Sequence, residues 1–356
     1  MLKIIGLIFL LIMTDAGYGY DRITGKPFAS RSEVIGQNGM VATSHPLATQ
    51  IGLDILKKGG TAIDAAIAAN IALGLMEPTG NGIGGDLFAI VWDAESKKLH
   101  GLNASGPAPK DISIDYFRDN DLEKIPSYGP LPVTVPGAVD GWIKLHEKFG
   151  KLEFRTLFEP TIAYAKNGFP VTETIAYYLK NSQKRFEKYP NFNELWVKNG
   201  SMPAKGEIFK NPQLAKTLET IALKGREGFY EGEVANVMVD FIQSQGGFLT
   251  HEDLSSFHSE WTPPVSSNYR GYDVWELPPN GQGIAALQIL NILEKFDLKK
   301  MGLFSAEYIH LFTEAKKLAF ADRAKYYADP NFSSIPVKEL ISKEYAEARS
   351  KKINFK

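Results

Sequence analysis

The stretch "NGIGGDLFAIVWD", residues 81–93, places Gly82, Gly84, Gly85 and Asp86 directly before an apolar run. Glycine-rich turns of this kind can hold phosphates through their backbone amides. A Walker loop, however, needs a lysine followed by serine or threonine, and a dinucleotide loop needs a strand before its glycines and a helix after them. Here the sequence predicts a helix before the glycines and a strand after them. The reversed order argues against a nucleotide site.

The same four residues also have a structural interpretation, which the residue types alone favour. Glycines supply unusual backbone angles and allow layers to pack closely at a corner between a helix and a strand. An aspartate that follows them bonds local main-chain amides. We therefore expect Gly82, Gly84, Gly85 and Asp86 to form a structural turn.

No set of histidines has the spacing of a metal site. The HExxH pattern is absent, and His251 and His258 are seven residues apart at a predicted helix cap and a loop. His45 precedes Pro46 at a predicted helix start, where a neighbour of the cap is a better interpretation than a general base. The chain also has no Gly-x-Ser-x-Gly elbow. We therefore expect no metal, no cofactor and no complete catalytic set within this chain.

The composition is that of a folded protein whose charges nearly cancel. Of 356 residues, 44% are hydrophobic, which is enough for a sizeable core. Lys and Arg number 40 against 41 Asp and Glu, so no net field attracts nucleic acid or an anionic membrane. The absence of cysteine excludes disulfides and thiolate catalysis.

Residues 1–19 predict a secretion signal. Lys3 precedes an apolar run over residues 4–13, and Gly17 and Gly19 are small enough for a signal-peptidase site. A run of this length is too short to span a bilayer comfortably. The alternatives are an uncleaved anchor and a buried strand. We expect export to the periplasm or to the exterior.

The elements on both sides of the glycine turn have clear signals. Ser44 is the expected N-cap of a first amphipathic helix. Thr61 and Asp64 have the spacing of a capping box, and the alanine-rich helix after them is expected to be buried on more than one face. After the turn, residues 87–93 and 99–105 predict a hairpin.

The rest of the chain mixes helices with extended segments. Helices are predicted over residues 138–150, 154–168, 211–225, 232–247, 283–297 and 305–330, and extended segments over residues 262–281. Because helices and strands do not alternate as in a parallel sheet, the predicted class is a layered α+β fold. We expect residues 20–356 to form one folding unit.

Seven segments make a pattern that is more specific than any single motif. They cover residues 40–78, 81–88, 132–142, 157–171, 246–254, 269–297 and 322–330, and include "PVTVPGAVDGW", "GGFLTHEDL" and "DRAKYYADP". In this order they resemble the large subunit of the γ-glutamyltranspeptidase family, the glutathione hydrolases. The resemblance covers most of the chain after the predicted signal.

The resemblance implies a fold, a reaction and a partner. Family members are made as a zymogen that cuts itself and so exposes a threonine at the N-terminus of a small subunit. The threonine hydroxyl attacks a γ-glutamyl amide such as glutathione, its own α-amine acts as the base, and water or an amino acid releases the acyl group. The implied fold is the four-layer αββα sandwich of N-terminal-nucleophile hydrolases. The glycine turn, residues 82–86, would then be a scaffold beside the catalytic cleft.

The nucleophile is the first departure from the family pattern. A second threonine commonly follows the catalytic one, and the chain contains no Thr-Thr pair. We therefore expect a large-subunit portion that forms a heterodimer with a small subunit carrying the threonine. The alternatives are a related amide hydrolase with another acyl substrate and a catalytically inactive fragment.

Asn103 is the second departure. Well-known members carry an arginine near this position that pairs with the α-carboxylate of the γ-glutamyl group, and here "LNASGPAP" has asparagine. A charged hydrogen bond to a carboxylate contributes about 1.5–3 kcal/mol, against about 1 kcal/mol for a neutral one. We expect Asn103 to bind substrate more weakly than arginine and transpeptidation to be poor. The alternative is a turn residue at a strand end.

Overall fold

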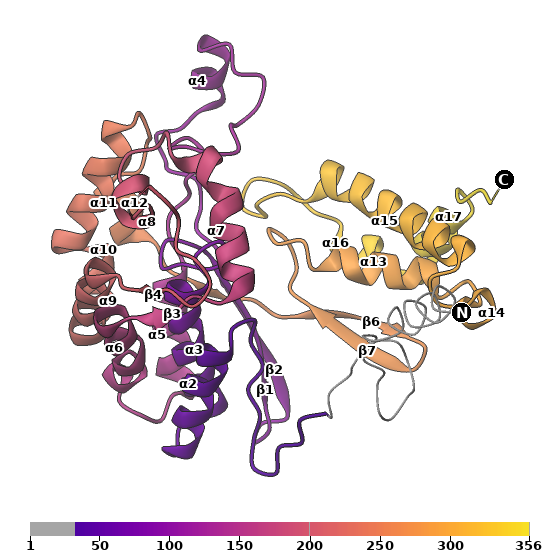
Figure 1. Cartoon of the computed structure of the whole chain (residues 1–356). Coiled ribbons are helices and arrows are strands. Elements are labelled where there is room, and N and C mark those ends of the chain that lie inside the picture. The colour runs from indigo at the N-terminus through magenta and orange to yellow at the C-terminus, as the bar shows by residue number, and fades with distance from the viewer. Residues whose placement is uncertain (1–32, 199, 356) are drawn as a thin grey trace, which may run out of the picture. The chain divides into compact units, whose positions relative to one another are not determined.

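The computed structural model describes residues 33–198 and 200–355, and it divides into two compact units, Met1–Met40 and Val41–Lys356. The predicted secretion signal, residues 1–19, lies outside the described residues. Every helix and strand labelled in Figure 1 belongs to the second unit. Within the described ranges, no helix combines the length and the apolar character needed to cross a membrane.

Two packed helices open the second unit, α2 (Pro46–Lys57) and α3 (Ala62–Met76). The prediction of Ser44 as the N-cap of α2 is wrong: His45 holds that position, and its Nδ1 accepts from the amide of Leu47 at 3.3 Å. The Thr61–Asp64 capping box of α3 is confirmed. Buried residues occur all round α3, as its alanine content predicts.

The predicted hairpin is confirmed and forms most of a three-stranded antiparallel sheet. Strand β1 (Leu87–Asp93) pairs with β2 (Lys98–Ala104), which pairs in turn with β5 (Glu260–Trp261). The register places Phe88 opposite Asn103. Alternation along β1 buries Val91 and leaves Phe88, Ile90 and Trp92 exposed on the other face.

A group of helices packs against α3 and the hairpin and contains the largest part of the core (Figure 1). Its helices are α5 (Ala138–Phe149), the 3-10 helix η2 (Phe154–Leu157), α6 (Glu159–Asn167), α9 (Pro212–Lys224), α10 (Glu227–Tyr230), α11 (Gly232–Ser244) and α12 (His251–Ser256). The aromatic side chains of Trp142, Phe158 and Phe229 are buried there. The same part of the chain contains α4 (Ile114–Asp119), α7 (Glu173–Phe186), α8 (Phe192–Trp196) and the paired short strands β3 (Phe169–Pro170) and β4 (Ile208–Phe209).

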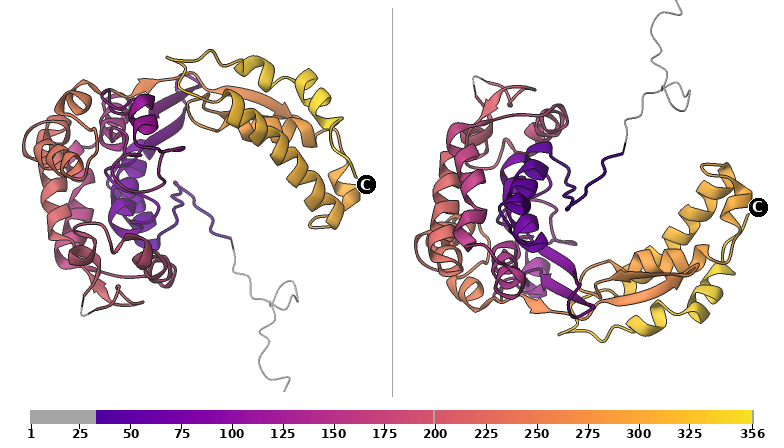
Figure 2. Two further views of the ribbon diagram at one scale, coloured as in Figure 1. Left: turned by 90° about the horizontal axis from the view of Figure 1, so that it is seen from above. Right: turned by 90° about the horizontal axis from the view of Figure 1, so that it is seen from below.

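The last ninety or so residues build a hairpin covered by helices. Strands β6 (Val265–Tyr269) and β7 (Tyr272–Glu276) pair antiparallel, and α13 (Ile284–Leu293) packs on both strands and on α15 (Ala306–Tyr326). Figure 2 shows these orange and yellow segments side by side from two directions. The remaining helices are α14 (Leu298–Met301), α16 (Val337–Leu340) and α17 (Lys343–Ser350). The mixture of antiparallel sheets and helices confirms the predicted α+β class.

Candidate functional site

A groove of about 970 Å³ lies between the start of β1, the segment after β7 and the end of α15. Its apolar lining includes Phe88, Ile90 and Leu277. Its polar and charged lining residues are Asp86, Ser105, Glu276, Asn280, Gln282, Arg323 and Tyr327. An apolar wall with a few convergent polar groups is the usual composition of a small-molecule site.

Four segments far apart in the sequence bring these side chains together. Asp86 ends the glycine turn, and Ser105 follows β2. Asn280 and Gln282 belong to the connection between β7 and α13. Arg323, in the last turn of α15, donates through Nη1 to Oε1 of Gln282 and so holds that helix end to the connection.

Asn103 is engaged in a network of side-chain amides at the groove. Its Nδ2 donates to Oδ1 of Asn280 at 2.8 Å, and its Oδ1 accepts from the amide of Ser105 at 3.0 Å. Asn280 Nδ2 in turn donates to Oγ of Ser105 at 2.7 Å. Asn103 therefore joins the end of β2 to the connection after β7, and two of its partners line the groove. Its contact with a substrate stays a prediction.

Two carboxylates of the groove are partly withdrawn from water. Burial raises the pKa of Asp86, although a hydrogen bond from the amide of Gly106 at 3.4 Å opposes the shift. Burial also raises the pKa of Glu276. Desolvation of this kind favours the protonated form, and a cation brought into the groove would reverse it.

Arg323 is the cationic side chain among the described residues that line the groove. Its guanidinium carbon lies 4.5 Å from the centroid of the Phe320 ring, and its bond to Gln282 uses only part of its five N–H donors. The planar fork of a guanidinium matches the two oxygens of a carboxylate. Arg323 can therefore form an ion pair with an anion in the groove, which the neutral Asn103 cannot do.

The expectation of unusual backbone angles and close packing is wrong for Gly82 and Gly84. Neither residue has a left-handed φ, and a Cβ built on either would meet no atom of the described chain within 4 Å. Gly85 also lacks a left-handed φ, and a Cβ built on it would lie at an ordinary contact distance, 3.4 Å, from the carbonyl oxygen of Gly82. The turn is thus open on its outer side.

The close packing that the sequence indicates is found at neighbouring glycines instead. A Cβ on Gly106 would overlap the carbonyl of Val135, and one on Gly137 would overlap the carbonyl of Ala104. The turn itself is fixed by its Gly85 carbonyl, which accepts from the amides of Gly137 at 3.0 Å and Ala138 at 2.9 Å. The glycine turn is therefore anchored to the first residues of α5.

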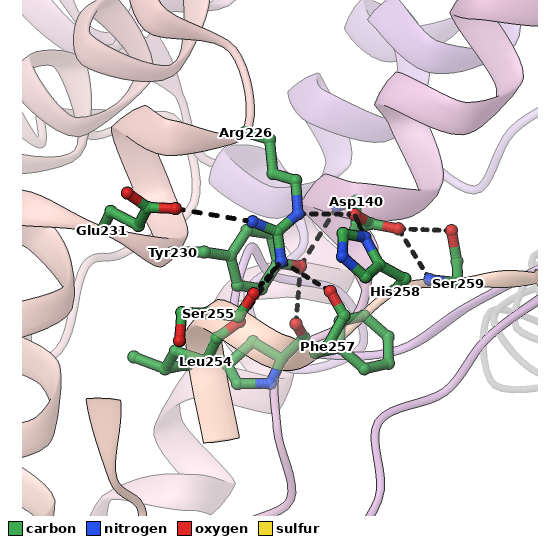
Figure 3. A network of polar contacts seen from close by, with 10 residues as sticks. Asp140, Arg226, Tyr230, Glu231, Leu254, Ser255, Phe257, His258 and Ser259 are labelled. Atoms are coloured by element: carbon green, nitrogen blue, oxygen red, sulfur yellow. Dashed lines mark hydrogen bonds and ion pairs between the residues drawn. The ribbon is translucent and has the colours of Figure 1, made fainter. Parts of the chain in front are cut away.

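Asp140, near the start of α5, is the centre of a buried polar network (Figure 3). One carboxylate oxygen accepts from Arg226 Nε at 3.1 Å, and the other accepts from the amide of Ser259 at 2.7 Å and from its hydroxyl at 2.5 Å. Arg226 also donates to the carbonyls of Ser255 and Phe257. The network therefore joins the start of α5 to the segments that precede α10 and β5.

His251 and His258 contact different residues. His251 Nε2 lies 2.9 Å from Oδ1 of Asn236, whereas His258 Nδ1 lies 3.8 Å from Asp140. Among the residues with described positions, no group of histidine and acidic side chains has the arrangement of a metal site.

Sequence reasoning missed most of the residues that line the groove. Asn280 and Gln282 lie in "ELPPNGQG", where polar residues between prolines and glycines precede a helix. That signal suits a binding loop. Arg323 and Glu276 have no comparable local signal, because only the tertiary fold brings them to Asp86.

One family model matches most of the chain. Residues 48–356 match the model described as gamma-glutamyltranspeptidase. The chain belongs to the γ-glutamyltranspeptidase family. Two curated relatives are the glutathione hydrolase-like YwrD proenzyme of Bacillus subtilis (strain 168), 38% identical over 90% of this chain and 61% of its own length, and the glutathione hydrolase proenzyme of Escherichia coli (strain K12), 35% identical over 90% and 56%. The chain thus spans a little over half of these γ-glutamyltranspeptidase relatives.

Solved structures confirm the fold of this γ-glutamyltranspeptidase family member. The γ-glutamyltranspeptidase of Helicobacter pylori has a TM-score of 0.85 and 35% identity, over 91% of this chain and 94% of that chain. A cephalosporin acylase from Bacillus halodurans has a TM-score of 0.86 and 44% identity, over 93% of this chain and 62% of that chain. The chain therefore has the fold of N-terminal-nucleophile hydrolases over the part that it covers.

Proposed function

We propose that this chain is the large-subunit portion of a γ-glutamyl hydrolase or transferase, active with a small subunit that carries an N-terminal threonine. The observation that carries the proposal is the family match over residues 48–356 together with curated relatives that are proenzymes about 1.6 to 1.8 times as long as the aligned region. The groove beside the glycine turn is the proposed place for the acyl group.

The proposed reaction is acyl transfer in two steps. The threonine hydroxyl oxygen bonds to the amide carbonyl carbon, and its proton passes by way of the threonine α-amine to the leaving nitrogen as the C–N bond breaks. Water or an amino acid then attacks the resulting ester and regenerates the hydroxyl. In this chain, Phe88, Ile90 and Leu277 would exclude water from the methylene groups of the acyl chain.

The charges of the groove support an acyl group that ends in a polar head. Arg323 suits a carboxylate, and Asp86 and Glu276 suit an ammonium. Asn103 supplies no charge, and both ends of its amide already have partners. We propose that Arg323 takes over the part of carboxylate recognition that an arginine near Asn103 would perform.

Strand β1 supports the proposed heterodimer. It pairs with β2 on one edge, and within the described part of the chain its other edge has no partner strand. Its outward side chains remain apolar and exposed, with 46% of Phe88 and 59% of Trp92 accessible. An unpaired, apolar strand of this kind favours association with a further strand.

Another acyl substrate is the second candidate. The 44% identity to a cephalosporin acylase and the neutral Asn103 both favour a broader amide preference. The distinction lies in the acyl group alone, because the threonine chemistry would be shared.

Export of the protein stays a prediction, which rests on residues 1–19.

Mass spectrometry of the native assembly tests the proposal. We expect a second polypeptide that begins with threonine and that gains the mass of the acyl group when substrate is trapped by acid. A preparation in which the acyl group is found on this chain would contradict it. Purification of this chain without any threonine-initiated polypeptide from cells that show the activity would do the same.

A further inference from the structure

A second cavity, of about 740 Å³, is formed by α7, α8, α11 and the segment that precedes α5, residues 127–133 (Figure 1). Its volume is within the range of small-molecule sites. It shares no lining residue with the groove beside the glycine turn. The proposed acyl transfer therefore gives this cavity no task.

The wall of the cavity is mainly aromatic. Phe186 is the last residue of α7, and its ring centroid lies 5.2 Å from that of Tyr128 and 5.9 Å from that of Phe192. The ring of Tyr189 lies 6.2 Å from Phe186, and Phe241 of α11 adds a ring from another helix. Aromatic rings at these separations attract one another and attract further rings. The wall therefore suits an occupant that is itself aromatic.

The main core fixes one side of the cavity. Trp196 of α8 stacks on the buried ring of Phe209, with centroids 4.8 Å apart and planes 5° apart, and Ile242 of α11 packs against the same core. A Cβ on Gly247 would lie 2.9 Å from the Cβ of Pro130, so this glycine lets the segment before α5 approach the end of α11. These contacts exist without an occupant, and the cavity is thus preformed.

The described residues that line the cavity include no charged side chain, although 23% of the whole chain is charged. Arg185 and Lys188 are close in sequence but do not line it. Each lies over an aromatic ring, with Arg185 5.2 Å from the Tyr128 centroid and Lys188 5.2 Å from the Tyr189 centroid. A charge moved from water into an apolar cavity without a partner carries a large cost. The lining therefore favours an uncharged occupant.

A few polar groups of the lining can orient such an occupant. The hydroxyls of Tyr128 and Tyr189 and the side-chain amide of Asn191 make no hydrogen bond to another described residue. Asn191 is the N-cap of α8, with a left-handed φ of 66°, yet its side chain does not bond the helix amides as asparagine caps usually do. Its amide thus keeps both donors and its acceptor for another molecule.

We infer that this cavity binds an uncharged small molecule that carries aromatic rings and at least one hydrogen-bonding group, such as a hydroxyl. The rings pack among Tyr128, Phe186 and Phe241, and the polar group bonds the amide of Asn191 or a tyrosine hydroxyl. The inference goes beyond the proposed function, because the cavity is separate from the groove and its occupancy needs no acyl transfer.

A matched pair of probes tests the absence of charge. The uncharged probe is para-(hydroxymethyl)benzophenone, and para-benzoylbenzoate has the same two rings with a carboxylate in place of the alcohol. Calorimetric titration of the chain paired with its small subunit should show one site for the alcohol, with a Kd of about 1 mM or lower. The anion should bind about tenfold more weakly or worse. Equal or tighter binding of the anion, or no binding of the alcohol, would overturn the inference.

Substitutions in the wall test the place of binding. Phe241→Asp puts a carboxylate into the lining and should weaken binding of the alcohol by about tenfold or more. Val237→Asp is the matched control, because it puts the same charge on α11 at a residue that is 64% exposed and does not line the cavity. Tyr128→Ser repeats the test away from α11, with the exposed Tyr177→Ser of α7 as its control. Equal weakening by variant and control in both pairs, at equal melting temperatures, would overturn the inference.

Irradiation gives an independent location, since the benzophenone ketone attaches covalently to neighbouring C–H groups and peptide mass spectrometry finds the modified residue. We expect attachment within residues 127–133, 186–196 and 241–245 of the wild-type pair. Attachment elsewhere would overturn the inference. Attachment there in the isolated chain but not in the pair would also overturn it, because the small subunit would then cover the cavity. These measurements need no turnover, so their failure leaves the proposed function intact.

Discussion

Arg323 and Asn103 are the residues on which the proposed recognition of a substrate carboxylate depends. Arg323 brings the charge from the end of α15, whereas Asn103 uses its amide to hold the connection after β7. The position that the family resemblance picks out thus differs from the position at which this fold places a cation. When two neighbouring segments line the same groove, either one can supply the positively charged side chain.

Arg323→Gln should raise KM for a γ-glutamyl anilide by about tenfold or more, because a charge-assisted hydrogen bond to the carboxylate is lost. Arg323→Lys should recover part of the loss, since the charge remains without the planar fork. Steady-state kinetics of the pair measures both. The control is an anilide whose acyl chain has no carboxylate, for which KM should not change; an equal rise for both anilides would contradict the assignment.

Asn103→Arg tests the carboxylate contact that the family resemblance implies at this position. If a cation there can reach the substrate, KM for γ-glutamyl substrates should fall. The substituted side chain must also give up the bonds to Asn280 and Ser105, so the melting temperature should be recorded in parallel. A higher KM with an unchanged melting temperature would show that the position has no contact with the carboxylate.

We predict that protonation of His45 lowers the free energy of unfolding at acidic pH. The ring is 1% exposed, its Nδ1 caps α2, and its Nε2 has no hydrogen-bond partner in the described structure. Burial lowers the pKa of His45 below its ordinary value of 6.5, although Glu77 opposes the shift. Because the unfolded state then binds the proton more tightly, the free energy of unfolding should fall as pH decreases below 6.5 and continue to fall down to the folded-state pKa.

His45→Asn is the matched variant, since asparagine also caps helices and does not titrate. Urea unfolding between about pH 7 and pH 5 should show a smaller slope for the variant than for wild type. Equal slopes would mean that the acid sensitivity comes from other groups.

The contacts between neighbouring elements depend on polar groups that have hydrogen-bond partners. Asp140 of α5 holds Arg226, which precedes α10, and the amide of Ser259, which precedes β5, so one carboxylate fixes three segments (Figure 3). The glycine turn is attached to the same helix start through Gly85. A substitution at Asp140 should therefore also disturb the glycine turn beside the groove.

Asp140→Asn should lower the free energy of unfolding by about 3 kcal/mol, because it leaves the largely buried Arg226 without its nearest counter-charge. Asp115→Asn is the control: its pair with Arg118 is exposed, so the change should stay below about 1 kcal/mol. Equilibrium denaturation of the chain paired with its small subunit measures both. Similar small losses for the two variants would show that the Asp140 network contributes little.

The elements themselves were largely predictable, and the groove was not. Thr61 and Asp64 define the start of α3 within four residues, and the alternation in "LFAIVWD" defines β1, because both signals are local. The shift of the α2 cap from Ser44 to His45 changed one boundary by one residue. Arg323 reaches Gln282 only through the packing of α15 on α13, which no local pattern specifies.

The isolated chain should expose apolar surface that its partner would cover. Phe88, Ile90 and Trp92 remain exposed in the chain alone, and β1 has an unpaired edge in the described structure. We expect the isolated chain to bind a hydrophobic dye and to aggregate, and pairing to suppress both. Light scattering and dye fluorescence measure this. A soluble monomer that melts cooperatively and ignores the dye would contradict the expectation.

In the proposed enzyme, catalysis needs a hydroxyl from outside this chain. The rate at which purified material releases p-nitroaniline from a γ-glutamyl anilide tests this need, measured for this chain alone and for the chain with its threonine-initiated partner. We expect no release above the uncatalysed rate for the chain alone and saturable release for the pair. Saturable release by the chain alone would show that the hydroxyl lies within it.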